Sequence, residues 1–178
     1  MSKLKVFNIV GFQISWWACV LSAKSQMIYL GPLCMIIFIM IHFWKVTDNI
    51  NEIKLIAIFG VLGTLIDTMF MFSGILSYSG LYSKNILIAP LWITAMWCGF
   101  SATINHSMLW LNNKWMLSFI LGLVFGPLSY ITGEKFGAIH FFADIKIIIV
   151  VLAVVWGISI PLISVSYTHL RAHETLIY

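Results

Sequence analysis

The sequence predicts an all-α membrane protein, an up-and-down bundle of about six transmembrane helices. Of its 178 residues, 61% are hydrophobic and only 9% are charged. A soluble domain keeps about a quarter of its residues charged, so this composition is typical of a chain whose solvent is lipid. Each apolar segment has close to the ~20 residues that cross a hydrocarbon core of ~30 Å. The segments do not alternate polar and apolar residues, which excludes the strands of a membrane barrel.

The first three helices are predicted at Phe7–Ala23, Met27–Trp44 and Leu55–Leu76. Lys3 and Lys5 precede the first of them, as basic residues precede the apolar core of a signal peptide. We expect this helix to remain in the protein, because it contains the bulky pair Trp16 and Trp17 and lacks a good cleavage site. A very short connection joins it to the second helix, which favours an antiparallel hairpin.

The last three helices are predicted at Pro90–Leu111, Trp115–Ile131 and Ile145–Ile163. Pro90 suits the first turn of a helix, where its missing N–H leaves no hydrogen bond unmade. A second tight connection precedes Trp115 and predicts another antiparallel hairpin. The longer connections have no room for a catalytic domain, so any chemistry would lie in the bilayer or at its face.

Residues 1–163 are thus predicted to form one integral membrane domain, and residues 164–178 a non-native tail. The run Val165–Thr175 reads VSYTHLRAHET, which resembles the in-frame translation of a sequencing adapter. Such segments are excluded from reasoning about the fold. We therefore assign no site role to His169 or His173.

The net charge of +4 is carried by lysines that lie between the apolar segments. This arrangement is typical of membrane topology and of contact with anionic headgroups, and no basic motif points to nucleic acid. With six helices, five lysines fall on the N-terminal side and four on the other, a weak signal for a cytoplasmic N-terminus. The three cysteines are isolated within apolar segments and indicate neither a disulfide nor a metal framework.

Asp67, near the middle of the third helix, is the sharpest polar feature. A mid-membrane aspartate costs ~2.5–3.5 kcal/mol on insertion scales, so it is normally buried against partners and often functional. A rise of ~1.5 Å per residue places Asp67 ~18 Å and Tyr130 ~22 Å from the N-terminal side, which makes a direct pair reasonable. Two interpretations stay open: Asp67 holds helices together, or it relays protons or contacts a substrate.

A second polar layer is predicted from Gln13, Asn105 and His106, which lie at a similar depth of ~9 Å. Their side chains could bond another helix or hold a lipid headgroup or substrate. The depth gap of ~9 Å between Asp67 and His106 argues against an acid–base dyad. His106 has no second histidine, cysteine or glutamate at ligand spacing, so no metal site is predicted. His42 is expected to reach the membrane interface.

Small residues in and after the fifth helix predict close helix packing. Gly122 and Gly126 form a GxxxG step, which lets two helices approach closely. Pro127 is expected to kink the helix, and Gly133 and Gly137 follow it. Broken helices also line transporter sites, but we interpret this region as packing.

Several short motifs, in order and spacing, carry a family resemblance. They are Asp67 with Gly74-Ile75-Leu76, then Pro90-Leu91-Trp92, Asn105-His106-Ser107-Met108-Leu109-Trp110-Leu111 and Gly126-Pro127-Leu128-Ser129-Tyr130. Over nearly all of residues 1–163 the chain resembles a bacterial inner-membrane family catalogued as domain of unknown function 2878. Met108 and Leu109 stand where that family often shows Leu and Arg. The resemblance implies the location and fold class and, through frequent neighbouring genes for fatty-acid or phospholipid modification, a link to lipids.

The leading hypothesis is a non-catalytic accessory to bacterial lipid modification or the envelope stress response. Its expected partners are membrane lipids, further copies of the chain or lipid-modifying enzymes, and no cofactor is expected. One alternative is a small membrane-embedded lipid-modifying enzyme that uses Asp67 with Asn105 and His106, Tyr130 being a further catalytic candidate. Another is a proton-coupled transporter that acts as an oligomer.

Overall fold

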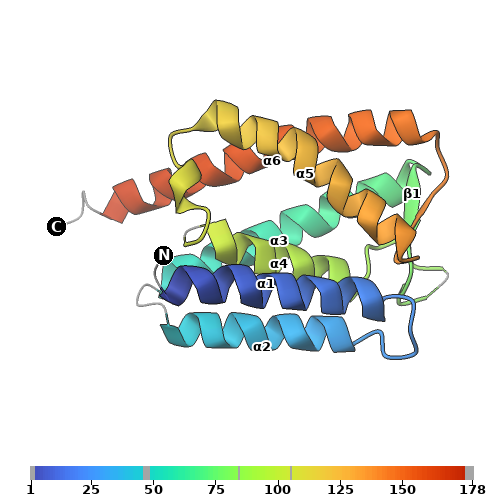
Figure 1. Ribbon diagram of the computed structural model, residues 1–178, viewed down its shortest axis with the longest axis horizontal. Helices are drawn as coiled ribbons and strands as arrows, with labels where there is room; N and C mark the ends of the chain where they lie inside the picture. Colours follow the sequence, from blue (N-terminus) through green and yellow to red (C-terminus); the bar gives the residue numbers. More distant parts are fainter. Residues whose placement is uncertain (1–2, 46–48, 84, 105, 175–178) are drawn as a thin grey trace.

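The computed structural model describes residues 3–45, 49–83, 85–104 and 106–174, with side chains apart from those of Asn49 and residues 163–174. The all-α fold class is confirmed, because six α-helices make up most of these residues. They are α1 (Lys3–Ser22), α2 (Leu30–Lys45), α3 (Asn49–Phe72), α4 (Leu91–Ile104), α5 (Trp115–Lys135) and α6 (Ile145–Glu174). Successive helices run in opposite directions, so that α1 begins at the same end of the bundle where α2 ends and α3 begins (Figure 1).

Four helical segments are long and apolar enough to cross a membrane, namely Lys3–Ser22, Ile50–Phe72, Trp115–Lys135 and Ile145–Leu162. Their outer faces are apolar: Ile14, Val61 and Val150 expose 63%, 60% and 61% of their surface. In water such a surface would be an aggregation hazard, whereas lipid is as apolar as these side chains. The chain is therefore an integral membrane protein.

Two helices are shorter than the sequence predicts. α2 has 16 residues and α4 has 14, which correspond to lengths of about 24 and 21 Å. α4 ends at Ile104 instead of continuing to Leu111, and a 3-10 turn, η1 (Leu109–Leu111), follows. The Thr103 carbonyl accepts hydrogen bonds from the backbone N–H groups of both His106 and Met108, which closes a turn in place of another helical turn.

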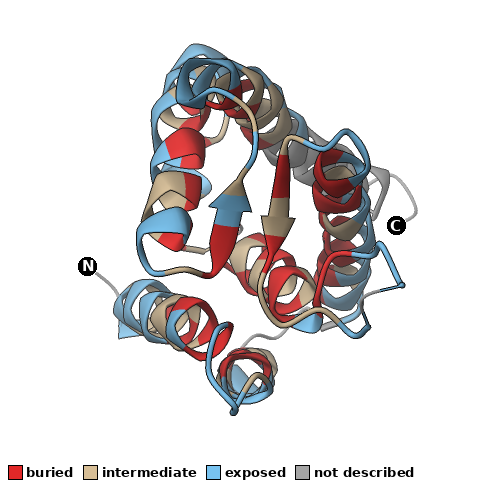
Figure 2. Ribbon diagram, turned by 90° about the vertical axis from the view of Figure 1, so that its right-hand side faces the viewer, coloured by how far each residue is buried: buried red, intermediate tan, exposed pale blue. Residues whose placement is uncertain are grey.

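A two-stranded antiparallel sheet, which the sequence did not predict, lies at the opposite end of the bundle from the start of α1. Strands β1 (Leu76–Tyr78) and β2 (Ile139–Phe141) follow α3 and α5 and pair with Ser77 opposite His140. Figure 2 looks onto this end, where the strands lie side by side between the helices. The sheet thus joins the ends of α3 and α5.

The helices pack as consecutive pairs: α1 with α2, α3 with α4, and α5 with α6. α4 also packs on α1 and α2, but α5 packs chiefly on α6. The predicted antiparallel direction of α4 and α5 is present (Figure 1), but the two helices do not pack closely on each other. The space between them is lined by side chains that form the candidate site.

The α5–α6 contact is close because of two glycines. A Cβ atom at Gly122 would clash with the backbone carbonyl of Trp156 in α6, and one at Gly126 would clash with the Trp156 side chain. Pro127 lies inside α5, and the helix continues past it from Trp115 to Lys135. At the end of α5, Gly133 lies against Ile139 of β2. Gly137 then adopts a φ of 72°, which favours glycine and turns the chain into β2.

Candidate functional site

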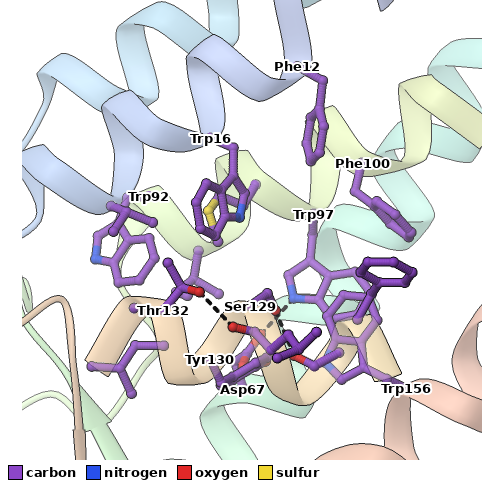
Figure 3. A pocket seen from close by; sticks show the side chains of 18 of the residues that line it. Phe12, Trp16, Asp67, Trp92, Trp97, Phe100, Ser129, Tyr130, Thr132 and Trp156 are labelled. Carbon is purple, nitrogen blue, oxygen red and sulfur yellow. Dashed lines mark hydrogen bonds between the residues drawn. The ribbon is translucent and has the colours of Figure 1, made fainter. Parts of the chain in front are cut away.

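A cavity of about 380 Å³ lies among α1, α4, α5 and α6, with α3 contributing Asp67. This volume lies within the range of small-ligand pockets. The wall is mainly apolar and rich in aromatic rings, among them Phe12, Trp16, Trp92, Trp97, Phe100 and Trp156. Figure 3 shows these rings gathered around one space, with Ser129, Tyr130 and Thr132 of α5 along one side. The few polar side chains among many rings suit a largely apolar ligand with one polar group.

The aromatic wall is held in a fixed geometry by ring contacts. The rings of Trp97 and Trp156 are stacked, with centroids 4.6 Å apart and planes at 7°. Phe100 meets Trp156 edge-on at 5.6 Å, and Trp16 meets Trp17 edge-on at 5.0 Å. Such pairs each contribute about 0.5–1.5 kcal/mol beyond their buried area, so the wall resists collapse into the cavity.

Asp67 forms the polar base of the cavity and is 1% exposed. Its Oδ2 accepts a 2.6 Å hydrogen bond from Trp97 Nε1, and its Oδ1 accepts hydrogen bonds from the hydroxyls of Tyr78 and Tyr130. Burial, followed by the charge of Asp67, raises the pKa of Tyr78, on β1 outside the spanning helices, well above its ordinary value of 10. Tyr78 therefore keeps its proton and remains a donor. One carboxylate thus joins α3, α4, α5 and β1.

The expected pair of Asp67 with Tyr130 is present, whereas Tyr78 and Trp97 were not predicted as its partners. Gln13 lines the same cavity as Asp67. The predicted layer of Gln13 with His106 does not match this placement, because His106 lies in a different cluster. Asn105 lies outside the described residues.

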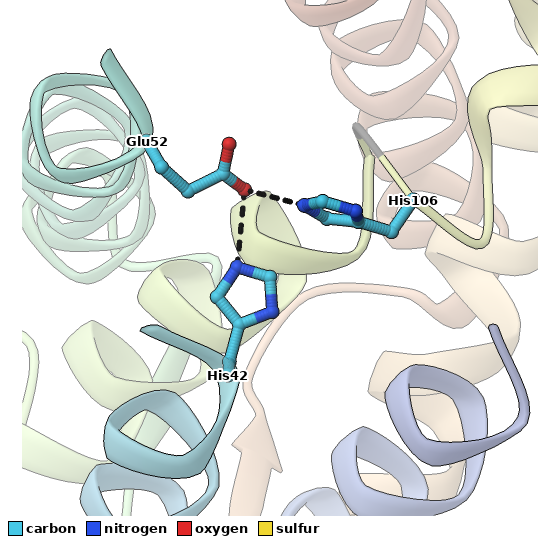
Figure 4. A group of neighbouring side chains, drawn as sticks. All are labelled: His42, Glu52 and His106. Carbon is cyan, nitrogen blue, oxygen red and sulfur yellow. Dashed lines mark hydrogen bonds and ion pairs between the residues drawn. The ribbon is translucent and has the colours of Figure 1, made fainter. Parts of the chain in front are cut away.

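His106 belongs to a cluster with His42 and Glu52, none of which lines the cavity (Figure 4). Glu52 Oε1 lies 3.1 Å from His42 Nε2 and 3.2 Å from His106 Nε2. His42 was expected at the membrane interface; in the structure its side chain is fully buried within the protein, near the end of α2. No metal site was predicted at His106 from sequence spacing, but the structure brings His42 and Glu52, which are distant in sequence, next to it. Their sequence positions could have predicted this cluster, because the three residues lie near the end of α2, the start of α3 and the end of α4. These helix ends meet at one end of the bundle.

A family model described as "Protein of unknown function (DUF2878)" matches residues 5–162. The match spans the helices that form the cavity, and it contains both Asp67 with its partners and the His42–Glu52–His106 cluster. No curated protein and no solved structure matches the chain.

Proposed function

We propose that this chain, which belongs to the family described as "Protein of unknown function (DUF2878)", is a non-catalytic lipid-binding accessory to bacterial lipid modification. Its cavity would hold a lipid acyl chain, and Asp67 would fix the cavity's shape. We further propose a location in the bacterial inner membrane, with the start of α1 on the cytoplasmic side, from the lysine distribution.

The observation that carries this proposal is an aromatic cavity inside a bundle whose outer face is apolar. A lipid acyl chain that enters the cavity from the bilayer leaves hydrocarbon, not water. The hydrophobic effect therefore contributes little to its binding. The gain comes from dispersion contacts with densely placed rings, which a loosely packed acyl layer does not supply. Fixed rings such as Trp97 and Trp156 also lower the entropic cost of ordering the wall around a ligand.

The hydrogen bonds of Asp67 support a positioning role over acid–base chemistry. Its Oδ1 accepts two bonds and its Oδ2 a third, all from neutral donors of the protein. A general base must reach the proton that it removes, and each of these donors would have to be displaced or turned away first. The arrangement therefore supports a carboxylate that joins helices.

Retention of lipid by the purified full chain tests the proposal. We would extract the protein in a mild detergent and quantify bound lipid by mass spectrometry. Ser129→Trp places an indole in the cavity and is expected to lose most of the retained lipid. Val124→Trp is the matched control, because Val124 lies on the same helix, is 47% exposed and does not line the cavity. Equal retention by the wild type and both variants, or no lipid on the wild type, would contradict the proposal.

A further inference from the structure

We propose that His42, Glu52 and His106 bind a divalent transition-metal ion, Zn²⁺ or Fe²⁺, at the end of the bundle where α1 begins. The potential ligand atoms are Nε2 of each histidine and a carboxylate oxygen of Glu52, and all lie within 4.8 Å of one another. Figure 4 shows both imidazoles directed at the same carboxylate oxygen. The residues come from α2, α3 and the turn after α4, so a bound ion would join three segments.

Two of the three distances between ligand atoms already fit coordination, and the third, between the two imidazoles, is at most 4.8 Å. Metal–ligand bonds of about 2.0–2.1 Å at tetrahedral angles put neighbouring ligand atoms about 3.3–3.4 Å apart. The distances from Glu52 Oε1 are 3.1 Å to His42 Nε2 and 3.2 Å to His106 Nε2. Small side-chain rotations therefore suffice to place an ion between the three groups. Two imidazoles with one carboxylate suit zinc and non-haem iron, and three protein ligands leave a position for a solvent oxygen.

Asn8 supplies an independent observation behind the cluster. It is fully buried, and its Nδ2 lies 3.0 Å from His42 Nδ1. Its Oδ1 is also buried and has no hydrogen-bond partner among the residues that the structure describes. Turning the amide by 180° lets this oxygen accept a hydrogen bond from the N–H group at His42 Nδ1, which leaves the lone pair of Nε2 for a metal. A histidine ligand almost always has such a second partner for its other ring N–H.

The burial of the three side chains indicates a site that is enclosed yet reachable. The side chains of His42 and Glu52 are 0% and 5% exposed, and that of His106 is 16% exposed. The Glu52 carboxylate lies within hydrogen-bond distance of both imidazoles, and in a metal site a dication would take the place of the protons between them. An ion would enter past His106.

Zinc binding to the full, tag-free chain tests the proposal. His169 and His173 are four residues apart and could bind zinc by themselves, so every sample carries His169→Gln and His173→Gln. The protein is stripped with a chelator, incubated with zinc chloride, dialysed and analysed for metal content. We expect one zinc per chain and a rise in Tm, at least a tenfold weaker affinity for His106→Gln, and unchanged binding for His140→Gln. His140 is the matched control, since it is an exposed histidine on β2, at the other end of the bundle.

No bound zinc after dialysis, or equal binding by His106→Gln, would overturn the proposal. Cobalt in place of zinc gives a measurement that needs no substitution at the site. A visible spectrum of nitrogen- and oxygen-bound, four- or five-coordinate Co²⁺ that zinc abolishes would support the site, whereas the spectrum of hydrated Co²⁺ would contradict it.

Discussion

The rings of Trp97 and Trp156 are stacked 4.6 Å apart, and the same Trp97 donates its indole N–H to Asp67. Because Trp97 belongs to α4 and Trp156 to α6, the stack joins α4 to α6. Asp67 then joins this wall to Tyr130 of α5. The aromatic wall and the polar base of the cavity are therefore one connected unit. A substitution at Asp67 should disturb the packing of α3, α4, α5 and α6.

Replacing Asp67 by leucine should destabilise the protein by about 3 kcal/mol or more, because three buried donors lose their acceptor. Asp67→Asn should cost less, about 1–3 kcal/mol, because its oxygen can accept from Trp97 and its NH₂ group can donate to the tyrosine oxygens, although the two hydroxyl protons lose their acceptor. Thermal unfolding in detergent measures both changes. Asp144→Asn is the control, because Asp144 is exposed and an amide can also accept from the Lys146 N–H. A leucine variant as stable as the wild type would refute the joining role.

Replacing Gly122 by alanine should separate α5 from α6. The added Cβ would clash with the backbone carbonyl of Trp156, which cannot rotate away. We expect a loss of about 1–3 kcal/mol, reduced by up to about 1 kcal/mol because alanine favours the helix. Gly60→Ala is the glycine control, since its Cβ would clash with a single side-chain atom, the Sγ of Cys98, which can turn away by rotation about χ1, whereas a backbone carbonyl cannot. Unfolding midpoints that fall equally in both variants would contradict this account of the helix contact.

The accessory role predicts how membrane lipids respond to Asp67→Asn. We would profile lipids by mass spectrometry in a strain deleted for a full-length homologue and restored with the wild type or with Asp67→Asn. We expect the deletion to change the lipid profile and both proteins to restore it, because the amide still joins the helices. Failure of Asp67→Asn at normal membrane abundance would instead favour an enzyme or a proton-coupled transporter.

The parts of the site on regular helices could be predicted, because a fixed rise per residue turns sequence position into depth. This is how Asp67 and Tyr130 were expected to meet. Tyr78 could not be found this way, because its position depends on a turn at Gly74, where φ is 69°, and on pairing of β1 with the distant β2. The end of α4 was missed because the predicted helix was continued through the polar stretch after Thr103 to the apolar residues up to Leu111, whereas backbone hydrogen bonds to the Thr103 carbonyl close a turn there.

The cluster of His42, Glu52 and His106 was also missed because it depends on where helices end. The expectation for His42 treated a position near a helix end as exposed, and Glu52 was placed in a connection instead of the first turn of α3. In the structure α3 begins earlier, and the ends of three segments enclose these side chains. Helix ends are the least predictable feature of a sequence, so sites built from them are the easiest to miss.

The most direct test of the central claim is to locate the acyl chain on the protein. A fatty acid with a photoreactive group in its chain would be supplied to cells, activated by light, and its cross-links mapped by peptide mass spectrometry. The account predicts cross-links at residues that line the cavity, such as Trp16 and Met96, and their loss in Ser129→Trp but not in Val124→Trp. Cross-links confined to the outer face, at Ile14, Val61 and Val150, would show that the cavity does not hold lipid.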